Sequence, residues 1–314
     1  MNVHSLLWPN KPTLFGGKVY VYAVIIVFGM VAAYFVISTL FKRRNMSSDL
    51  FMTYFVITVP IAIVTTRLFY CITDGLPVSE WFSMSSIRNG GLSIIGGILG
   101  GAICVIVISI VKKVNFLRVA DCVVVGLLLA QAIGRWGNFV NQEVYGAEVT
   151  NSALQFFPFA VYIEDEGAWH YAFFFYESFV NFTAAVLLFI NAWRNGKKPN
   201  GINASCYLIV YGLTRSIMEP LRDKTYILSG GGVPWSLVMS LCILLSGLGM
   251  LFYVLFTNKK REGTLLGSKT GDPYGITAYI GDKKDEVPYF SKLNMMCAIH
   301  PENYTKKEKE NKDQ

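Results

Sequence analysis

The sequence predicts an all-α integral membrane protein with seven transmembrane helices. Of its 314 residues, 53% are hydrophobic and 16% are charged, and the mean hydropathy is +0.42. Such a composition does not describe a soluble globular domain. Seven apolar segments each approach the ~20 residues that a helix needs to cross the hydrocarbon core of a bilayer. They are residues 19–41, 50–73, 90–111, 119–140, 171–193, 202–218 and 233–257.

The first segment is expected to stay in the protein as a helix. Residues 19–41 form an apolar run longer than the roughly 7–15 residues of a signal peptide's apolar region. Its basic flank, Lys42, Arg43 and Arg44, comes after the run, whereas a signal peptide carries basic residues before it.

Charged residues between the segments predict the orientation of the chain, because short cytoplasmic loops collect Lys and Arg. Basic residues follow the first, third, fifth and seventh segments, and acidic residues dominate after the second and fourth. The amino terminus is therefore expected outside and the carboxyl terminus in the cytoplasm. Residues 1–257 form the predicted transmembrane domain. Residues 258–314 are polar and mixed in charge, which predicts a partly disordered cytosolic tail.

The third segment contains three pairs of glycines between positions 90 and 101. It lacks the Lys-Ser/Thr end of a nucleotide-binding loop and lies in an apolar run, so no nucleotide is expected there. Small residues four positions apart let helices or lipid chains approach closely. The net charge of +7 comes largely from the cytoplasmic loops and the tail, and it does not indicate nucleic-acid binding.

Polar residues gather near the outer end of the fourth segment. Arg135 and Asn138 are three positions apart and share a helix face, and Asn141 and Glu143 follow at its end. A charged side chain at membrane depth costs roughly 3 kcal/mol or more, so it usually faces a protein interior or a wet cavity. The planar guanidinium of Arg135 suits a phosphate, which favours a phospholipid over a bare metal ion. A buried structural ion pair would also account for one such arginine.

The sixth segment carries a second polar stripe on the same side of the membrane. Tyr211, Arg215, Glu219 and Arg222 are spaced four, four and three residues apart and line one helix face. Pro220 ends or kinks the helix here, and the freed backbone groups need polar surroundings. The two stripes together predict a polar cavity that opens toward the outside.

Other polar residues within the segments are ambiguous by themselves. Asp121, at the cytoplasmic end of the fourth segment, is expected to be a structural partner. Arg67 is expected to extend toward the interface, and Tyr22 to join an aromatic belt by its position. Glu177 in the fifth segment has no clear role.

Together these motifs resemble the prolipoprotein diacylglyceryl transferase family in its Gram-positive form, over most of residues 15–257. Residues 135–143, followed by Gly146, are similar to the family signature nearly residue for residue. Residues 211–222 resemble a second essential segment and residues 176–178 a third. Tyr22 falls where the family has an amino-terminal tyrosine.

The resemblance implies a transferase of lipoprotein biosynthesis in the cell membrane. It would move the diacylglyceryl group of phosphatidylglycerol to the lipobox cysteine thiol of a prolipoprotein signal peptide and release glycerol phosphate at the outer leaflet. No cofactor or metal is implied. The implied catalytic residues are Arg135, Asn138, Asn141, Glu143, Arg215, Glu219 and Tyr211. The implied substrate-binding residues are Arg135, Arg215, Arg222, Gly146, Tyr22 and Glu177.

One position departs from the family pattern. The glycine-rich segment of the family commonly has a His, a candidate base, where this chain has Ile95. A thiol attacks as the thiolate, so its proton must go elsewhere. The remaining candidates for the base are Glu143, Glu177, Glu219 and His170. A mechanism without a dedicated base also stays open.

Other functions stay open as well. The departure at Ile95 and the long tail would fit a degenerate or altered-acceptor paralogue that binds phospholipid without this transfer. A lipid carrier of the scramblase type would share the contacts between arginine and phosphate. A transporter or channel would also place charges between helices, but the sequence shows no convincing repeat of the kind that transporters carry.

Overall fold

The computed structural model describes residues 13–14, 19–44, 46–81, 83, 93–112, 114–194, 200–221, 229–230 and 233–256. The predicted tail at 258–314, Arg222 and the side chain of Ile95 lie outside the described residues.

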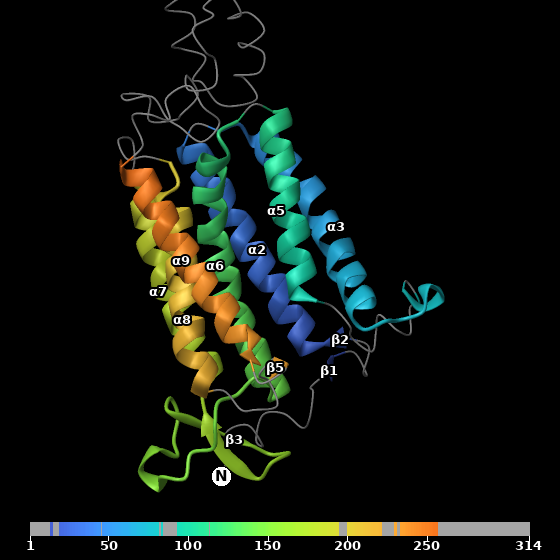
Figure 1. Ribbon diagram of the computed structural model, residues 1–314, viewed down its shortest axis with the longest axis vertical. Helices are drawn as coiled ribbons and strands as arrows, with labels where there is room; N and C mark the ends of the chain where they lie inside the picture. The colour runs from blue at the N-terminus through green and yellow to red at the C-terminus, as the bar shows by residue number, and fades with distance from the viewer. Residues whose placement is uncertain are drawn as a thin grey trace, which may run out of the picture. The chain divides into compact units, whose positions relative to one another are not determined.

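The described residues are mostly helical (Figure 1). Their seven α-helices are α2 (Val21–Arg43), α3 (Ser48–Thr73), α5 (Ile94–Val111), α6 (Phe116–Asn141), α7 (Phe173–Trp193), α8 (Ile202–Met218) and α9 (Trp235–Phe256). Five of these, α2, α3, α6, α7 and α9, are long and apolar enough to cross a membrane. Over the described residues, α5 and α8 do not meet that length and hydropathy. The chain is thus a mostly helical membrane protein with five clear candidate spans.

The chain divides into two compact units. The first comprises Met1–Leu40 and Ala120–Asn258, so it holds most of α2 and α6 together with α7, α8 and α9. The second comprises Phe41–Val119 and Lys259–Gln314, so it holds α3 and α5. Every described residue of the predicted site belongs to the first unit.

Within the second unit, α3 and α5 pack along the glycine-rich face of α5. A Cβ atom on Gly97 would lie only 2.5 Å from Oγ1 of Thr66, so a larger residue would push the helices apart. The hydroxyls of Tyr54 and Ser109 share a hydrogen bond of 2.8 Å between the two helices. The predicted close approach at this segment is confirmed.

Arg67, which the sequence led us to expect at the interface, is buried against the segment that follows α3. Its side chain is 3% exposed, because its Nε donates a hydrogen bond of 2.7 Å to the carbonyl oxygen of Trp81. Its Nη2 also donates to the carbonyl oxygen of Glu80, at 3.3 Å. Arg67 therefore holds the 3₁₀-helix η1 (Val78–Glu80) against α3.

In the first unit, Asp121 of α6 caps the amino terminus of α8. Its carboxylate accepts hydrogen bonds from the backbone N–H groups of Gly201, at 2.9 Å, and Ala204, at 3.0 Å. Asp121 is 1% exposed, and a carboxylate at this end of a helix satisfies donors that have no partner within the helix. These contacts agree with the structural role expected for Asp121.

Short β-hairpins accompany the helices, which the all-α prediction did not include. In the described residues they pair β1 (Thr13–Leu14) with β2 (Val19–Tyr20), β3 (Ala160–Ile163) with β4 (Ala168–Tyr171), and β5 (Ser229–Gly230) with β6 (Val233–Pro234). The predicted helix starts at 19, 171 and 233 are therefore wrong by two residues each. Apolar strand residues lead directly into these helices, and hydropathy alone does not separate the two.

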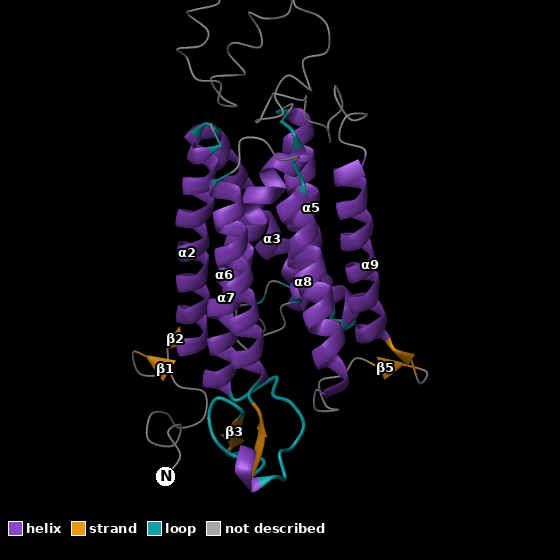
Figure 2. Cartoon of the chain, turned by 90° about the vertical axis from the view of Figure 1, so that its left-hand side faces the viewer, coloured by secondary structure: helices purple, strands orange, loops and turns teal. Residues whose placement is uncertain are grey.

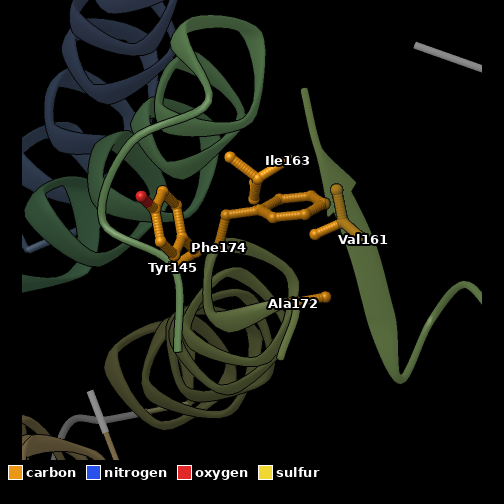
Figure 3. Close-up of a cluster of buried hydrophobic side chains, with 5 residues drawn as sticks. All are labelled: Tyr145, Val161, Ile163, Ala172 and Phe174. Atoms are coloured by element: carbon orange, nitrogen blue, oxygen red, sulfur yellow. The ribbon is translucent and has the colours of Figure 1, made fainter. Parts of the chain in front are cut away.

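The hairpin of β3 and β4 is fixed to its unit by a small hydrophobic core (Figure 3). This core consists of Tyr145, Val161, Ile163, Ala172 and Phe174, with Phe139 and Phe175 packed against it. Figure 2 shows β3 beyond the ends of α6 and α7, at the bottom of the view. The core therefore joins the hairpin to the end of α6, where the family-like motif lies.

Candidate active site

Glu177 brings two arginines together from two different helices. Its side chain, on α7, is 3% exposed and pairs through Oε2 with Nη2 of Arg135 on α6. Its Oε1 lies 3.4 Å from Nη1 of Arg215 on α8. The arginine side chains are 23% and 22% exposed, so each stays partly accessible. Two guanidiniums share one carboxylate, and the excess positive charge favours an anionic ligand such as a phosphate.

A second polar chain extends from Arg135 along the end of α6. Nη1 of Arg135 donates to Oδ1 of Asn138 at 3.3 Å, and Nδ2 of Asn138 donates to Oε1 of Glu143 at 3.0 Å. Nδ2 of Asn141 donates to the same oxygen at 3.5 Å. The arginine, the two asparagines and the glutamate therefore form one continuous network, whereas the spacing predicted only that Arg135 and Asn138 share a face.

A strained turn after α6 returns Glu143 to this network. Gln142 and Val144 have φ angles of 50° and 58°, a left-handed conformation that costs a non-glycine residue energy and is often kept at functional sites. The backbone N–H of Glu143 donates to the carbonyl oxygen of Asn138 at 3.0 Å. Oε1 of Gln142 accepts a hydrogen bond of 2.9 Å from the backbone N–H of Glu164. The hairpin region therefore holds the turn in place.

Tyr22 and Gly146 are placed by close packing. The ring of Tyr22 lies against Gly137, where a Cβ atom would be 2.6 Å from Cδ2 of the ring. A Cβ atom on Gly146 would be 2.7 Å from Cβ of Tyr171. Gly146 also donates from its N–H to the carbonyl oxygen of Tyr171 at 3.1 Å, which aligns the chain after the turn with β4. Any larger residue at either glycine would clash, and the half-buried Tyr22 packs on α6 close to Arg135 and Glu143.

Glu219 lies at the start of the 3₁₀-helix η3 (Glu219–Leu221), which follows α8. It is 2% exposed, and neither carboxylate oxygen has a hydrogen-bond partner among the described residues. The carbonyl oxygen of Leu221 accepts from the N–H of Ala147 at 2.9 Å, so η3 is bonded to the segment that carries Gly146. A buried carboxylate without a partner is costly, which is typical of a group kept for function.

A family model described as prolipoprotein diacylglyceryl transferase matches residues 12–253. The chain belongs to this family. A phosphatidylglycerol–prolipoprotein diacylglyceryl transferase of Clostridium perfringens is 34% identical over 249 residues, which are 78% of this chain and 94% of the relative. Enzymes of the same name are 35% identical over 241 residues in Finegoldia magna, covering 75% and 91%, and 34% identical over 235 residues in Streptococcus agalactiae, covering 74% and 90%. The chain is thus a transferase of a lipoprotein-biosynthesis family.

Not every residue predicted for the site of this transferase lies in the polar network. Tyr211 stacks on Tyr207, with ring centroids 6.0 Å apart, and among the described residues it makes no hydrogen bond to the arginines. His170 is 2% exposed, with Nδ1 2.9 Å from the carbonyl oxygen of Gly146 and Nε2 3.1 Å from Oε2 of Glu166. The Nδ1 contact holds the segment after the turn, whereas Nε2 lies near Glu166 without a hydrogen bond among the described residues.

Sequence reasoning missed the polar residues that lie deeper than Arg135. Nε2 of Gln131 on α6 donates to the hydroxyl of Tyr207 on α8 at 3.0 Å. Gln131 precedes Arg135 by four residues, and Tyr207 precedes Tyr211 by four, so both extend the predicted stripes by one turn. That spacing was the signal that could have identified them. Elsewhere in the described chain, no three His, Cys, Asp or Glu side chains gather as metal ligands would.

Proposed function

We propose that this protein transfers the diacylglyceryl group of phosphatidylglycerol to the cysteine thiol of a prolipoprotein. The observation that carries the proposal is the pair of arginines, Arg135 and Arg215, held together by Glu177 in a chain of this family. The names of its relatives include both the donor lipid and the acceptor protein. A positively charged, partly accessible cluster in a membrane protein is the setting that a phospholipid phosphate requires.

The proposed topology has seven helices across the plasma membrane, with the amino terminus outside and residues 258–314 in the cytoplasm as a tail. Arg135 lies near the carboxyl end of α6, Arg215 near that of α8, and Glu177 near the amino end of α7. Basic loops follow the carboxyl ends of α5 and α7, and short loops of this kind collect on the cytoplasmic side. The cluster then opens at the outer leaflet, where phosphatidylglycerol and the lipobox of the acceptor can both reach it.

In the proposed reaction, Arg135 and Arg215 bind the donor phosphate. The sulfur of the acceptor cysteine attacks the C3 carbon of the diacylglyceryl group, and a carbon–sulfur bond forms as the bond from this carbon to the phosphate oxygen breaks. The electron pair of the broken bond stays on that oxygen, so glycerol phosphate leaves with one more negative charge. Fixed positive charges stabilise such growing charge without reorganising during the reaction. Asn138 and Glu143 hold Arg135 in position.

The thiol proton goes to a carboxylate, for which we propose Glu219. Glu177 is paired with two arginines, and Glu143 already accepts hydrogen bonds from two asparagine side chains. His170 is held by Gly146 and Glu166. The Glu219 carboxylate is buried beside the Gly146 segment and, in the part of the chain that the structure describes, has both oxygens available.

The departure at Ile95 favours one alternative, a paralogue that binds phospholipid without this transfer. The purified protein, mixed with phosphatidylglycerol vesicles and a lipobox peptide, separates the two functions. Mass spectrometry is expected to show the peptide gain one diacylglyceryl group, and a peptide with Ser in place of the lipobox Cys is expected to remain unmodified. If the unaltered protein leaves the peptide unmodified and the Ile95→His variant modifies it, the result would contradict the proposed function and support the paralogue.

A further inference from the structure

Gln131 of α6 and Tyr207 of α8 form a polar contact between two otherwise mostly apolar helices. Its partners lie 76 positions apart in the sequence and 3.0 Å apart in the fold. Polar side chains at this depth in a membrane protein are expensive and usually serve a function. Both side chains are only partly buried, so neither is sealed in the core.

The pair has more hydrogen-bond donors than it uses. The Gln131 amide has two N–H donors and Tyr207 has one O–H donor, yet the described residues provide this pair with the single bond between them. Oε1 of Gln131 is buried and has no partner among those residues. If the amide is turned so that Tyr207 donates to Oε1, the two N–H groups become the free donors instead. In either arrangement at least one donor of the pair has no acceptor among the described residues.

The position of the pair matches the chemistry of a phospholipid below its phosphate. Gln131 precedes Arg135 by four residues, a rise of about 6 Å along α6 away from the arginine cluster. A phospholipid whose phosphate lies on Arg135 and Arg215 has its ester groups a few bonds deeper. Ester carbonyl oxygens accept hydrogen bonds and donate none, so they complement free donors at this level.

We propose that Gln131 and Tyr207 form a second binding site that recognises the ester carbonyls of the donor lipid. The inference rests on the proposed function and deepens it, because it assigns a preference for ester-linked over ether-linked chains. The pair positions the lipid through its ester groups and touches none of the bonds that break. Loss of the Gln131–Tyr207 pair weakens the binding of ester-linked lipids and leaves the binding of ether-linked lipids unchanged.

The test compares two donor lipids that differ only at these linkages. We expect the unaltered protein to use diester phosphatidylglycerol about five- to tenfold better in kcat/KM than its dialkyl ether analogue, the worth of about one hydrogen bond. Tyr207→Phe, which removes only the hydroxyl, is expected to bring this ratio close to one, mainly through KM for the ester lipid. Gln131→Met, of similar size, gives the same comparison if the first variant folds poorly.

Tyr162→Phe is the matched control, since it removes a tyrosine hydroxyl from the β3 hairpin, and its ratio is expected to equal that of the unaltered protein. A ratio of one in the unaltered protein, or an unchanged ratio in both Tyr207→Phe and Gln131→Met, would overturn the inference while the proposed function stands. If the unaltered protein transfers neither lipid, the proposed function fails and this inference falls with it.

Discussion

Replacing Arg135 with alanine is expected to lower diacylglyceryl transfer by about 100-fold or more, the loss that follows removal of one preorganised charge-stabilising donor. Arg135 contacts both Glu177 and Asn138, so it links the two halves of the polar network. Its loss removes a phosphate contact, while Glu177 keeps Arg215 as its partner. The protein should therefore still fold. The measurement is kcat/KM of the purified variant with phosphatidylglycerol and a lipobox peptide.

Arg135→Lys is the informative companion variant. It keeps the positive charge but loses the planar fork that can bind two phosphate oxygens together. We expect its rate to lie between those of the unaltered protein and Arg135→Ala. Near-normal transfer by Arg135→Ala, at equal amounts of folded protein, would show that the phosphate does not bind at this cluster.

Replacing Glu177 with alanine is expected to reduce both stability and activity. The carboxylate is 3% exposed and lies between two guanidiniums, so its removal leaves two like charges close together in an apolar unit. Removing one partner of a buried ion pair typically destabilises a protein by about 3–5 kcal/mol. We therefore expect a lower yield of folded protein, a lower unfolding temperature in detergent and little transfer.

The double variant Glu177→Ala, Arg215→Met separates repulsion from lost packing. If repulsion between the arginines causes the instability, removing one of them should recover part of the unfolding temperature, while transfer stays low. An unfolding temperature and transfer rate of Glu177→Ala equal to those of the unaltered protein would show that Glu177 does not organise the cluster.

The network on α6 could be predicted because helical spacing alone determines which side chains share a face. Arg135 and Asn138 are three residues apart, and on the helix face that they were expected to share they form a hydrogen bond. The junction at Glu177 could not be predicted, because it depends on how α6, α7 and α8 pack together. Glu177 seemed ambiguous in the sequence, yet in the structure it pairs with both arginines.

The remaining misses have separate causes. Hydropathy identified the helices but not the hairpin of β3 and β4, because its short strands combine apolar and aromatic residues with no period long enough to recognise. The left-handed turn at Gln142 and Val144 contains no glycine at these two positions, so the sequence does not indicate it. Tyr207 passed unnoticed because an isolated tyrosine in a membrane helix is ordinary until its partner Gln131 is known.

The most direct test of the proposed chemistry is the stoichiometry of the products. The purified protein would be mixed with vesicles of phosphatidylglycerol labelled in the head-group glycerol and with a lipobox peptide, and both products would be counted over time. We expect one glycerol phosphate released for each diacylglyceryl group that appears on the cysteine sulfur. Phosphate retained on the peptide, or acyl chains transferred without the glycerol backbone, would mean that a different bond breaks and would contradict the role given to Arg135 and Arg215.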